Sequence, residues 1–556
     1  MPSPIRLQNP SKKGFKPIAV QQKEARLRAL FEKGVRLHSE ENFYAAREVY
    51  ESVLAENPLH FDSLHLLGVA SAQAGELLLA VDLLSKAVDL NKSHAVAHNN
   101  LGSALAELKD WAGALESYNQ AVKLDPRYAL AYFNRGVAQE ELGGVDAALA
   151  SYLKATQINP ANSQAQSNYG LLLQVLRRLD EALLSFDLAI KADPQNVEAY
   201  SNRGNVFRDL MRYAESIADF DRAIAIDPQF ADAYWNKSIT HLFMGEWATA
   251  WDLYPWRWYR SDLGPENPRP PLYPDRFERA ADKPETLRVC IWAEQGVGDE
   301  IFHASMFAEA VAHFGSATIQ ADLRLITLLK RSIPGAVFVD KAFPVDFNSF
   351  DLHLAHGDLG YFFRRQIDDF KRVKSCYLQP DPNRTNALRA ELQMEGKLLC
   401  GITWRSKNKR LGSDKSIGLA KLLPILKNPA FRFVNLQYGD TADELAAFKA
   451  EHGVEIINCA SVDNFSDLDG HAALVQACDL LVTVSNSTAH FAGALGKPSY
   501  VMLSKGESML WYWANRYDKQ SIWYPAIQIY EQARYGYWDD VISDVSTTMK
   551  EKYIGT

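Results

Sequence analysis

Hydrophobic and polar positions repeat along residues 27–260 with a period of 34 residues. Within each period the apolar residues follow the 3.6-residue spacing of two amphipathic helices, and a turn follows. Six consecutive periods carry a glycine at one phase, with a small residue twelve positions later and a large one four positions further on. The glycines are Gly34, Gly68, Gly102, Gly136, Gly170 and Gly204. This spacing predicts one helix closely approached by another, then a turn.

The period resembles the tetratricopeptide repeat, a helix-turn-helix unit that stacks into a superhelix with a concave binding groove. We expect an N-terminal extension over residues 1–26 and about seven repeats over residues 27–260. The expected starts are near residues 27, 61, 95, 129, 163, 197 and 231. The seventh repeat has Ser238 in place of the glycine, and tryptophans crowd its end. We expect it to pack as a cap on the next domain.

Asparagines recur two positions before the glycine phase in the third to seventh repeats. They are Asn100, Asn134, Asn168, Asn202 and Asn236. A carboxamide both donates and accepts hydrogen bonds, so a ladder of them can bind an extended acceptor peptide by its backbone. The alternative is that these side chains serve the packing of the repeats. The ladder resembles that of O-GlcNAc transferase, whose repeats feed protein substrates to a catalytic domain.

Prolines break the helical pattern at residues 261–285, which indicates a linker. Beyond it, short apolar runs alternate with helical stretches in two series, so we expect parallel sheets covered by helices over residues 286–380 and 381–556. Nucleotides bind at the carboxyl ends of such strands. A dinucleotide oxidoreductase is a poor match, because Ile301 replaces the third glycine of G-x-G-x-x-G after Gly296 and Gly298.

A candidate anion site follows the apolar run at residues 480–484. Asn486 or Ser487 can cap the small-residue helix that begins there, and we expect free backbone amides near Thr488 and Ala489 to bind a phosphate. His490 can contact the same ligand or serve packing.

A second candidate lies in the loop WRSKNKRLGSDKS, residues 404–416, in a chain that is otherwise acidic. Its cations can neutralise a departing phosphate, or they are ordinary solvated charges. They are Arg405, Lys407, Lys409, Arg410 and Lys415. Gln437, at the end of the next strand, is a further candidate for contact with a nucleoside.

Four segments together carry a family resemblance. They are YPWRWYR (254–260), WAEQGVGDEIFHASMF (292–307), GITWRSKNKRLGSDKSIGLAKLLPIL (401–426) and VSNSTAHFAGALGKP (484–498). They resemble bacterial tetratricopeptide glycosyltransferases, whose catalytic part is similar to the heptosyltransferase family. That family has a metal-independent GT-B fold of two Rossmann-like halves, and some members with this domain order modify flagellin.

The resemblance implies an inverting transfer of a sugar from a nucleotide-sugar to a Ser or Thr of a protein. It implies that Asp299, after the turn glycines Gly296 and Gly298, is the catalytic base, whereas the alternative is an N-cap for the following helix. The implied donor-binding residues are Arg405, Lys415, Gln437, Asn486, Ser487, Thr488 and His490. No metal and no other cofactor is implied. The family has an aspartate where this chain has Ser485, so its sugar specificity does not carry over.

The composition of the chain indicates which classes of partner to expect. A net charge of -8 and a pI of about 6.0 give no overall basic field, so nucleic acid is not an expected partner. The sequence has no run that predicts a membrane span and no leader, and its five cysteines lack C-x-x-C spacing, so we expect a cytoplasmic protein. Two alternatives remain: a non-catalytic repeat adaptor with a degenerate nucleotide-binding domain, and a transferase that acts on a lipid or polysaccharide.

Overall fold

The computed structural model describes residues 18–40, 42–261, 263, 276–371, 375–408, 411–506 and 508–553. Three parts of the sequence predictions lie outside them: residues 1–17 of the extension, most of the proline-rich linker, and Lys409 and Arg410 of the basic loop. The chain divides into two compact units, Met1–Arg203 and Gly204–Thr556. Each unit is described by itself.

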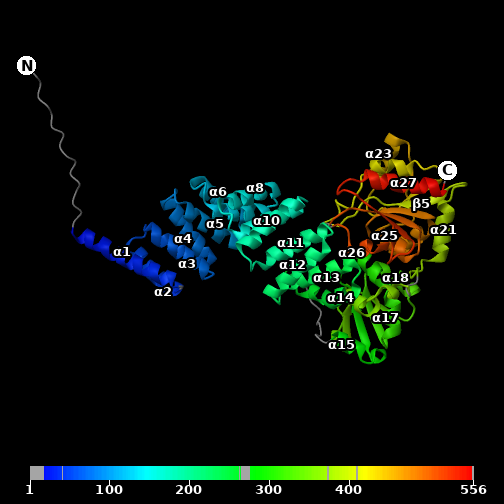
Figure 1. Ribbon diagram of the computed structural model, residues 1–556, viewed down its shortest axis with the longest axis horizontal. Helices are drawn as coiled ribbons and strands as arrows, with labels where there is room; N and C mark the ends of the chain where they lie inside the picture. The colour runs from blue at the N-terminus through cyan, green and yellow to red at the C-terminus, as the bar shows by residue number, and fades with distance from the viewer. Residues whose placement is uncertain are drawn as a thin grey trace, which may run out of the picture. The chain divides into compact units, whose positions relative to one another are not determined.

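The first unit consists of helices that follow one another in pairs (Figure 1). Helices α3, α5, α7, α9 and α11 begin at the residues predicted for repeats two to six, whereas α1 already begins at Ile18. The bounds are Ile18–Ser39 (α1), Phe43–Glu56 (α2), Phe61–Gln73 (α3), Leu77–Leu90 (α4), Ala95–Glu107 (α5), Trp111–Leu124 (α6), Ala129–Glu141 (α7), Val145–Ile158 (α8), Ser163–Val175 (α9) and Leu179–Ala192 (α10). Helix α11, Val197–Asp209, contains the division between the units.

The glycine phase of the repeats is where paired helices touch. A Cβ added to Gly136 would lie 2.5 Å from Cε1 of Tyr152, which is fully buried. Any side chain at residue 136 would therefore push α7 and α8 apart. This confirms the close approach of helices that the 34-residue period predicts.

The second unit begins with the end of α11 and the last helices of the repeats, which are Tyr213–Ile226 (α12), Ala231–Met244 (α13), Trp247–Leu253 (α14) and the 3-10 helix Tyr254–Tyr259 (η1). The indole nitrogen of Trp247 donates to Oδ1 of Asn515 at 3.0 Å, and Nδ2 of Asn515 donates to the carbonyl of Leu242 at 2.8 Å. Trp251 likewise donates to the carbonyl of Arg364 at 2.8 Å. The seventh repeat thus packs as a cap on the α/β part, as predicted.

The first α/β half, residues 286–380, contains a four-stranded parallel sheet in the order β3-β2-β1-β4. Its strands are Arg288–Trp292 (β1), Ser316–Ala321 (β2), Val337–Asp340 (β3) and Leu352–Ala355 (β4). Its helices are Val297–Ala304 (α16), Phe307–His313 (α17), Leu323–Ser332 (α18), Leu359–Phe363 (α19) and Ile367–Phe370 (α20), preceded by Arg276–Ala281 (α15). Because β1 lies between β2 and β4, the strand order reverses at the end of β1, where ligands bind in such sheets.

The second α/β half, residues 381–556, contains an eight-stranded sheet in the order β10-β11-β12-β9-β8-β5-β6-β7. Its strands are Leu398–Ile402 (β5), Phe431–Asn435 (β6), Ile456–Ile457 (β7), Leu480–Val484 (β8), Ser499–Leu503 (β9), Arg516–Tyr517 (β10), Gln520–Ser521 (β11) and Ile527–Glu531 (β12). Strands β5 to β9 and β12 pair in parallel, and β10 and β11 form an antiparallel edge. The strand order reverses between β5 and β8.

Helices surround the second sheet (Figure 1). They are Pro382–Leu392 (α21), Leu423–Leu426 (α22), Ala442–His452 (α23), Leu468–Ala477 (α24), Ser487–Ala494 (α25), Trp511–Ala514 (α26) and Asp539–Tyr553 (α27). Every residue of β8 and β9 is buried, as expected of parallel strands covered on both faces. The predicted α/β organisation of the C-terminal part is confirmed.

Candidate functional site

The carboxyl ends of β1, β5, β6 and β8 open onto one cavity of about 320 Å³ between the two α/β halves, which we call the interlobe cavity. Its lining comes from the loops and helix starts that follow those strands. The lining includes Gly296, Val297, Gly298 and Asp299 from the first half and Lys407, Lys415, Tyr438, Ser485, Asn486, Ser487 and His490 from the second. The site therefore joins the glycine turn, the basic loop and the strand-to-helix stretch that the sequence singles out.

Asp299 lies in the first turn of α16, whose N-cap is Gly296. The pKa of the Asp299 carboxyl is raised to about 6, chiefly by burial and in part by the charge of Glu294. The charge of Lys415 and hydrogen bonds from the backbone of Gly296 and Asp299 act in the opposite direction on that pKa. A carboxyl with a pKa close to neutrality can accept and release a proton under physiological conditions.

Lys415 brings a positive charge to the interlobe cavity from the second half. Only 5% of its surface is exposed, and burial lowers the pKa of its ammonium group, whereas the charge of Asp299 raises that pKa. Lys407 lines the same cavity and is exposed. Arg405 does not line it, because its guanidinium pairs with Glu444 at 2.9 Å instead.

The start of α25 is capped by Asn486. Its Oδ1 accepts the backbone N–H of Thr488 at 3.0 Å and that of Ala489 at 3.3 Å. Its Nδ2 donates to Oγ1 of Thr403 and to the carbonyl of Arg405. The prediction of free amides at Thr488 and Ala489 is therefore wrong, because the asparagine side chain satisfies them within the protein.

The other polar residues of this stretch are anchored by neighbouring side chains. Thr488 is buried, and its hydroxyl lies 3.2 Å from Nε2 of His471. Nδ1 of His490 lies 2.8 Å from the hydroxyl of Tyr524. Burial lowers the pKa of His490 to about 3, so at neutral pH its imidazole is uncharged.

Ser485 stands where the resembling family has an aspartate. Its Oγ accepts a hydrogen bond from the indole nitrogen of Trp513 at 3.1 Å, and it lines the interlobe cavity. The position thus keeps a hydrogen-bond acceptor and loses a negative charge.

Gln437 supports the basic loop. Its Oε1 accepts the backbone N–H groups of Trp404 at 3.0 Å and Arg405 at 2.8 Å. It lines a neighbouring cavity of about 450 Å³ that also includes Lys407, Asn458 and Phe465. Gln437 therefore lies beside the interlobe cavity rather than in its wall.

A second cavity, of about 330 Å³, lies between the last two repeats and the α/β part, and we call it the repeat-side cavity. Its repeat wall includes Tyr213, Trp235, Asn236, Ile239 and Phe243, and the facing wall includes Phe302, His303, Met509 and Trp511. Asp299, Leu510 and Tyr512 line both cavities. The candidate base therefore stands where the two cavities meet.

Three asparagines of the ladder contact other side chains of the repeats. Nδ2 of Asn100 lies 2.9 Å from Nε2 of His65 in the preceding repeat, and Nδ2 of Asn134 donates to Oδ1 of Asn99 at 3.0 Å. Asn168 lies 3.5 Å from the hydroxyl of Tyr152. Asn202 is half-buried, and Asn236 lines the repeat-side cavity. Packing between repeats thus occupies part of the ladder, and its role in binding a peptide stays a prediction.

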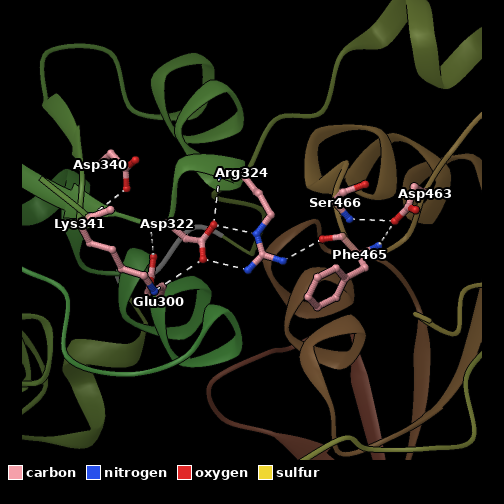
Figure 2. Close-up of polar contacts among 9 residues, drawn as sticks. Glu300, Asp322, Arg324, Asp340, Lys341, Asp463, Phe465 and Ser466 are labelled. Carbon is pink, nitrogen blue, oxygen red and sulfur yellow. Dashed lines mark hydrogen bonds and ion pairs between the residues drawn. The ribbon is translucent and has the colours of Figure 1, made fainter.

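The sequence did not indicate Arg324, which crosses between the two halves as Figure 2 shows. Its guanidinium is held by both carboxylate oxygens of Asp322 at 2.8 Å and donates to the carbonyl of Phe465 at 2.9 Å. It also lies 4.8 Å from the centre of the Phe465 ring. We call Asp322, Arg324 and Phe465 the interlobe clasp. No local pattern indicates a contact over this sequence distance.

Buried Glu300 holds the backbone of the interlobe clasp by a hydrogen bond. Its carboxylate accepts the backbone N–H of Asp322 at 2.7 Å and the Lys341 ammonium at 2.6 Å (Figure 2). The side-chain hydrogen bonds from Arg324 lower the pKa of Asp322 to about 2. Asp322 and Arg324 are therefore both charged at neutral pH.

The YPWRWYR segment has a structural role next to the site. Buried Arg257 donates to Glu294 at 3.0 Å and to Asp358 at 2.8 Å, and Glu294 also accepts the backbone N–H of Gly357 at 2.6 Å. Burial alone would raise the pKa of Asp358, but the charges of Arg257 and Arg276 outweigh it and lower that pKa. Arg257 thus ties the end of the repeats to the carboxyl ends of β1 and β4.

Within the described ranges, no group of three or more His, Cys, Asp or Glu side chains is placed to hold a metal ion. The expected independence of a metal stays a prediction. None of the described helices has both the length and the apolar character needed to cross a membrane.

Sequence profiles described as tetratricopeptide repeat match residues 32–95, 129–162 and 197–230, and one described as TPR repeat matches residues 102–143. The N-terminal part of the chain is built of tetratricopeptide repeats. Protein FlbA of Caulobacter vibrioides is 32% identical over 282 residues, which are 48% of this chain and 46% of that protein. The chain thus spans about half the length of this relative.

Solved structures of repeat proteins are also similar. MamA is 27% identical, with a TM-score of 0.28 over 30% of this chain and 96% of that one. YrrB, described as a TPR protein with an unusual peptide-binding site, is 22% identical, with a TM-score of 0.30 over 34% of this chain and 96% of that one.

Proposed function

We propose that this chain is a protein O-glycosyltransferase with a GT-B fold, which transfers a sugar with inversion and without a metal ion from a nucleotide-sugar to a Ser or Thr hydroxyl of a protein recruited by the repeats. The observation that carries the proposal is the position of Asp299, which lines both the interlobe cavity and the repeat-side cavity. A donor in one cavity and an acceptor in the other would meet at this carboxylate.

The interlobe cavity has the charges that a nucleotide-sugar needs. Buried Lys415 and exposed Lys407 face it, and both sheets reverse their strand order at its edge, where nucleotides bind in such folds. Lys415 can stabilise the negative charge that grows on the departing phosphate, as a metal ion does elsewhere. Uncharged His490 can accept or donate a hydrogen bond at the same wall.

In the proposed reaction Asp299 is the base. The carboxylate takes the proton of the acceptor hydroxyl while that oxygen attacks the anomeric carbon from the side opposite the phosphate. The bond between the anomeric carbon and the phosphate oxygen breaks, and its electron pair leaves with the nucleotide. The configuration of the sugar inverts, and Asp299 then releases its proton.

The compartment we propose is the cytoplasm. All five cysteines are free thiols, and four of them are buried. Reduced cysteines are typical of proteins from a reducing compartment.

Mass spectrometry of an acceptor protein tests the proposal. Flagellin, suggested by the resemblance, is co-expressed with the full chain in cells that make varied nucleotide-sugars. We expect a mass increment on Ser or Thr peptides that the Asp299→Asn variant abolishes. Asp282→Asn, a change of an exposed carboxylate just before the same half, should leave the increment intact.

Three results would contradict the proposal. A fully active Asp299→Asn variant would remove this residue from the mechanism. A partner that co-purifies without any sugar would favour a non-catalytic adaptor. Modification of a lipid-linked or polysaccharide acceptor, with the protein unchanged, would keep the chemistry and change the substrate class.

A further inference from the structure

Aromatic and aliphatic side chains contribute to both walls of the repeat-side cavity, beside polar groups. One wall comes from the last two repeats, where Tyr213 and Phe243 stack with their ring centres 6.3 Å apart and Trp235 lies 5.1 Å from Tyr254. Ile239 completes this wall on α13. Tyr254 is buried, but the other four side chains are only half-buried, so they present apolar surface to whatever enters the cavity.

The opposite wall also has aromatic and aliphatic side chains. Met509, Leu510 and Trp511 come from the segment that follows β9, and Phe302 comes from α16. Phe302 lies 5.6 Å from Trp511, ring centre to ring centre. Each wall therefore offers aromatic or aliphatic side chains against which an apolar group can pack.

Charged residues also line this cavity. Arg208 and Asp209 line it on the repeat side, and Asp299 lines it where it meets the interlobe cavity. His303 is buried, and burial lowers its pKa well below the ordinary value, so it adds no charge. Asn236 is the repeat residue whose carboxamide can bind a peptide backbone within the cavity.

We propose that the repeat-side cavity binds the acceptor segment directly beside its reactive hydroxyl, and that it selects an extended peptide with a bulky apolar side chain next to the modified Ser or Thr. This inference rests on the proposed function and specifies its acceptor. A volume of about 330 Å³ is at the small end of the range for ligand sites, and it suits a few residues of a peptide. An apolar side chain inserted between the two walls leaves water, which favours binding in proportion to the area buried.

Competition binding with the full chain tests this without any sugar donor. The probe is fluorescein-labelled Gly-Gly-Leu-Ser-Leu-Gly-Gly, followed by fluorescence anisotropy. The competitors are unlabelled peptides: the Leu peptide itself, and peptides in which Leu is replaced by Phe, Gly, Asp or Lys. We expect the Leu and Phe peptides to bind roughly tenfold or more tightly than the Gly and Asp peptides.

Variants of Ile239 place the binding in this cavity. Ile239→Asp should abolish the preference for Leu and favour the Lys peptide, because a carboxylate then faces the entering side chain. Ile239→Trp fills the cavity without adding charge and should weaken all peptides. Leu323→Asp is the matched control, since it makes the same kind of change at a residue that is 65% exposed and lines neither cavity.

The outcomes separate this inference from the proposed function. Equal binding of all peptides, an unchanged preference in both Ile239 variants, or binding of maltoheptaose in place of the peptides would overturn it. Transfer of a sugar to flagellin, with no preference for apolar peptides in the binding assay, would contradict this inference alone. A preference for apolar peptides without any sugar transfer would contradict the glycosyltransferase proposal and leave a peptide-binding site.

Discussion

The ring of His490 lies directly against Gly298. A Cβ added at residue 298 would be only 3.1 Å from Cδ2 of His490. Gly298 belongs to the first turn of α16 and His490 to α25. The helices that follow β1 and β8 therefore begin in contact across the two halves. Asp299 is the next residue, so its position depends on this close approach.

Gly298→Ala should misplace Asp299. The new methyl group can be accommodated only if His490 or α16 moves by a few tenths of an ångström. We expect a roughly tenfold to hundredfold lower kcat for sugar transfer, because small displacements of catalytic groups are costly. Gly296→Ala is the control, since its Cβ would lie 3.9 Å from Oδ2 of Asp299, an ordinary contact. Equal loss in both variants would contradict this reasoning.

Asp299→Asn should stabilise the protein above pH 6. The pKa of Asp299 is raised from 3.8 to about 6 in the folded state, so the folded state holds this proton more tightly than the unfolded chain. Its ionisation therefore costs stability as the pH rises from about 4 through 6. Since Asp299 is half-buried, we expect a gain of roughly 1–2 kcal/mol at pH 8 and none at pH 4. Urea denaturation at both pH values measures it, and a less stable variant at pH 8 would refute it.

The rate of transfer should rise with pH through about 6, because the base must be ionised and the pKa of Asp299 is about 6. Lys415→Gln removes a positive charge that lowers this pKa. The acidic limb of the pH–rate profile should then shift to higher pH, and kcat should also fall. A limb that stays in place in Lys415→Gln would show that another group controls it.

Arg324→Lys should weaken the interlobe clasp. A lysine can pair with Asp322, but it lacks the planar fork that also reaches the carbonyl of Phe465. We expect a raised KM for the nucleotide-sugar, because Arg324 and Phe465 line the interlobe cavity, which is the proposed donor site. We also expect a loss of stability of about 1 kcal/mol. Lys330→Ala on the exposed side of α18 serves as the control. An unchanged KM would leave the clasp with a purely structural role.

Asn515→Ala should destabilise the junction between the last repeat and the α/β part. The buried side chain accepts from Trp247 and donates to the carbonyl of Leu242, and both bonds are lost together. We expect a cost of roughly 2–4 kcal/mol, and a smaller one for Trp247→Phe, in denaturant unfolding. Trp258→Phe is the control, because the buried Trp258 indole nitrogen has no hydrogen-bond partner in the part of the chain that the structure describes. A larger loss in that control would refute the hydrogen-bond argument.

The sequence by itself determined the repeats and the α/β organisation. Helices α3, α5, α7, α9 and α11 begin at the predicted positions because the glycine and the large residue of each 34-residue period set a local contact, as Gly136 and Tyr152 do. The buried run of β8 and the polar stretch after it were equally visible, since a parallel strand needs apolar residues on both faces.

Only the tertiary structure decided how the site is assembled. It showed that Asn486 satisfies the amides predicted to be free, that Arg405 pairs with Glu444 away from the cavity, and that Arg324 reaches Phe465. It also placed Asp299 at the meeting point of two cavities. The physical reason is that periodicity reports the surroundings of a residue along its own helix or strand. Contacts between the two halves depend on strand order and on the packing of side chains that lie far apart in the chain.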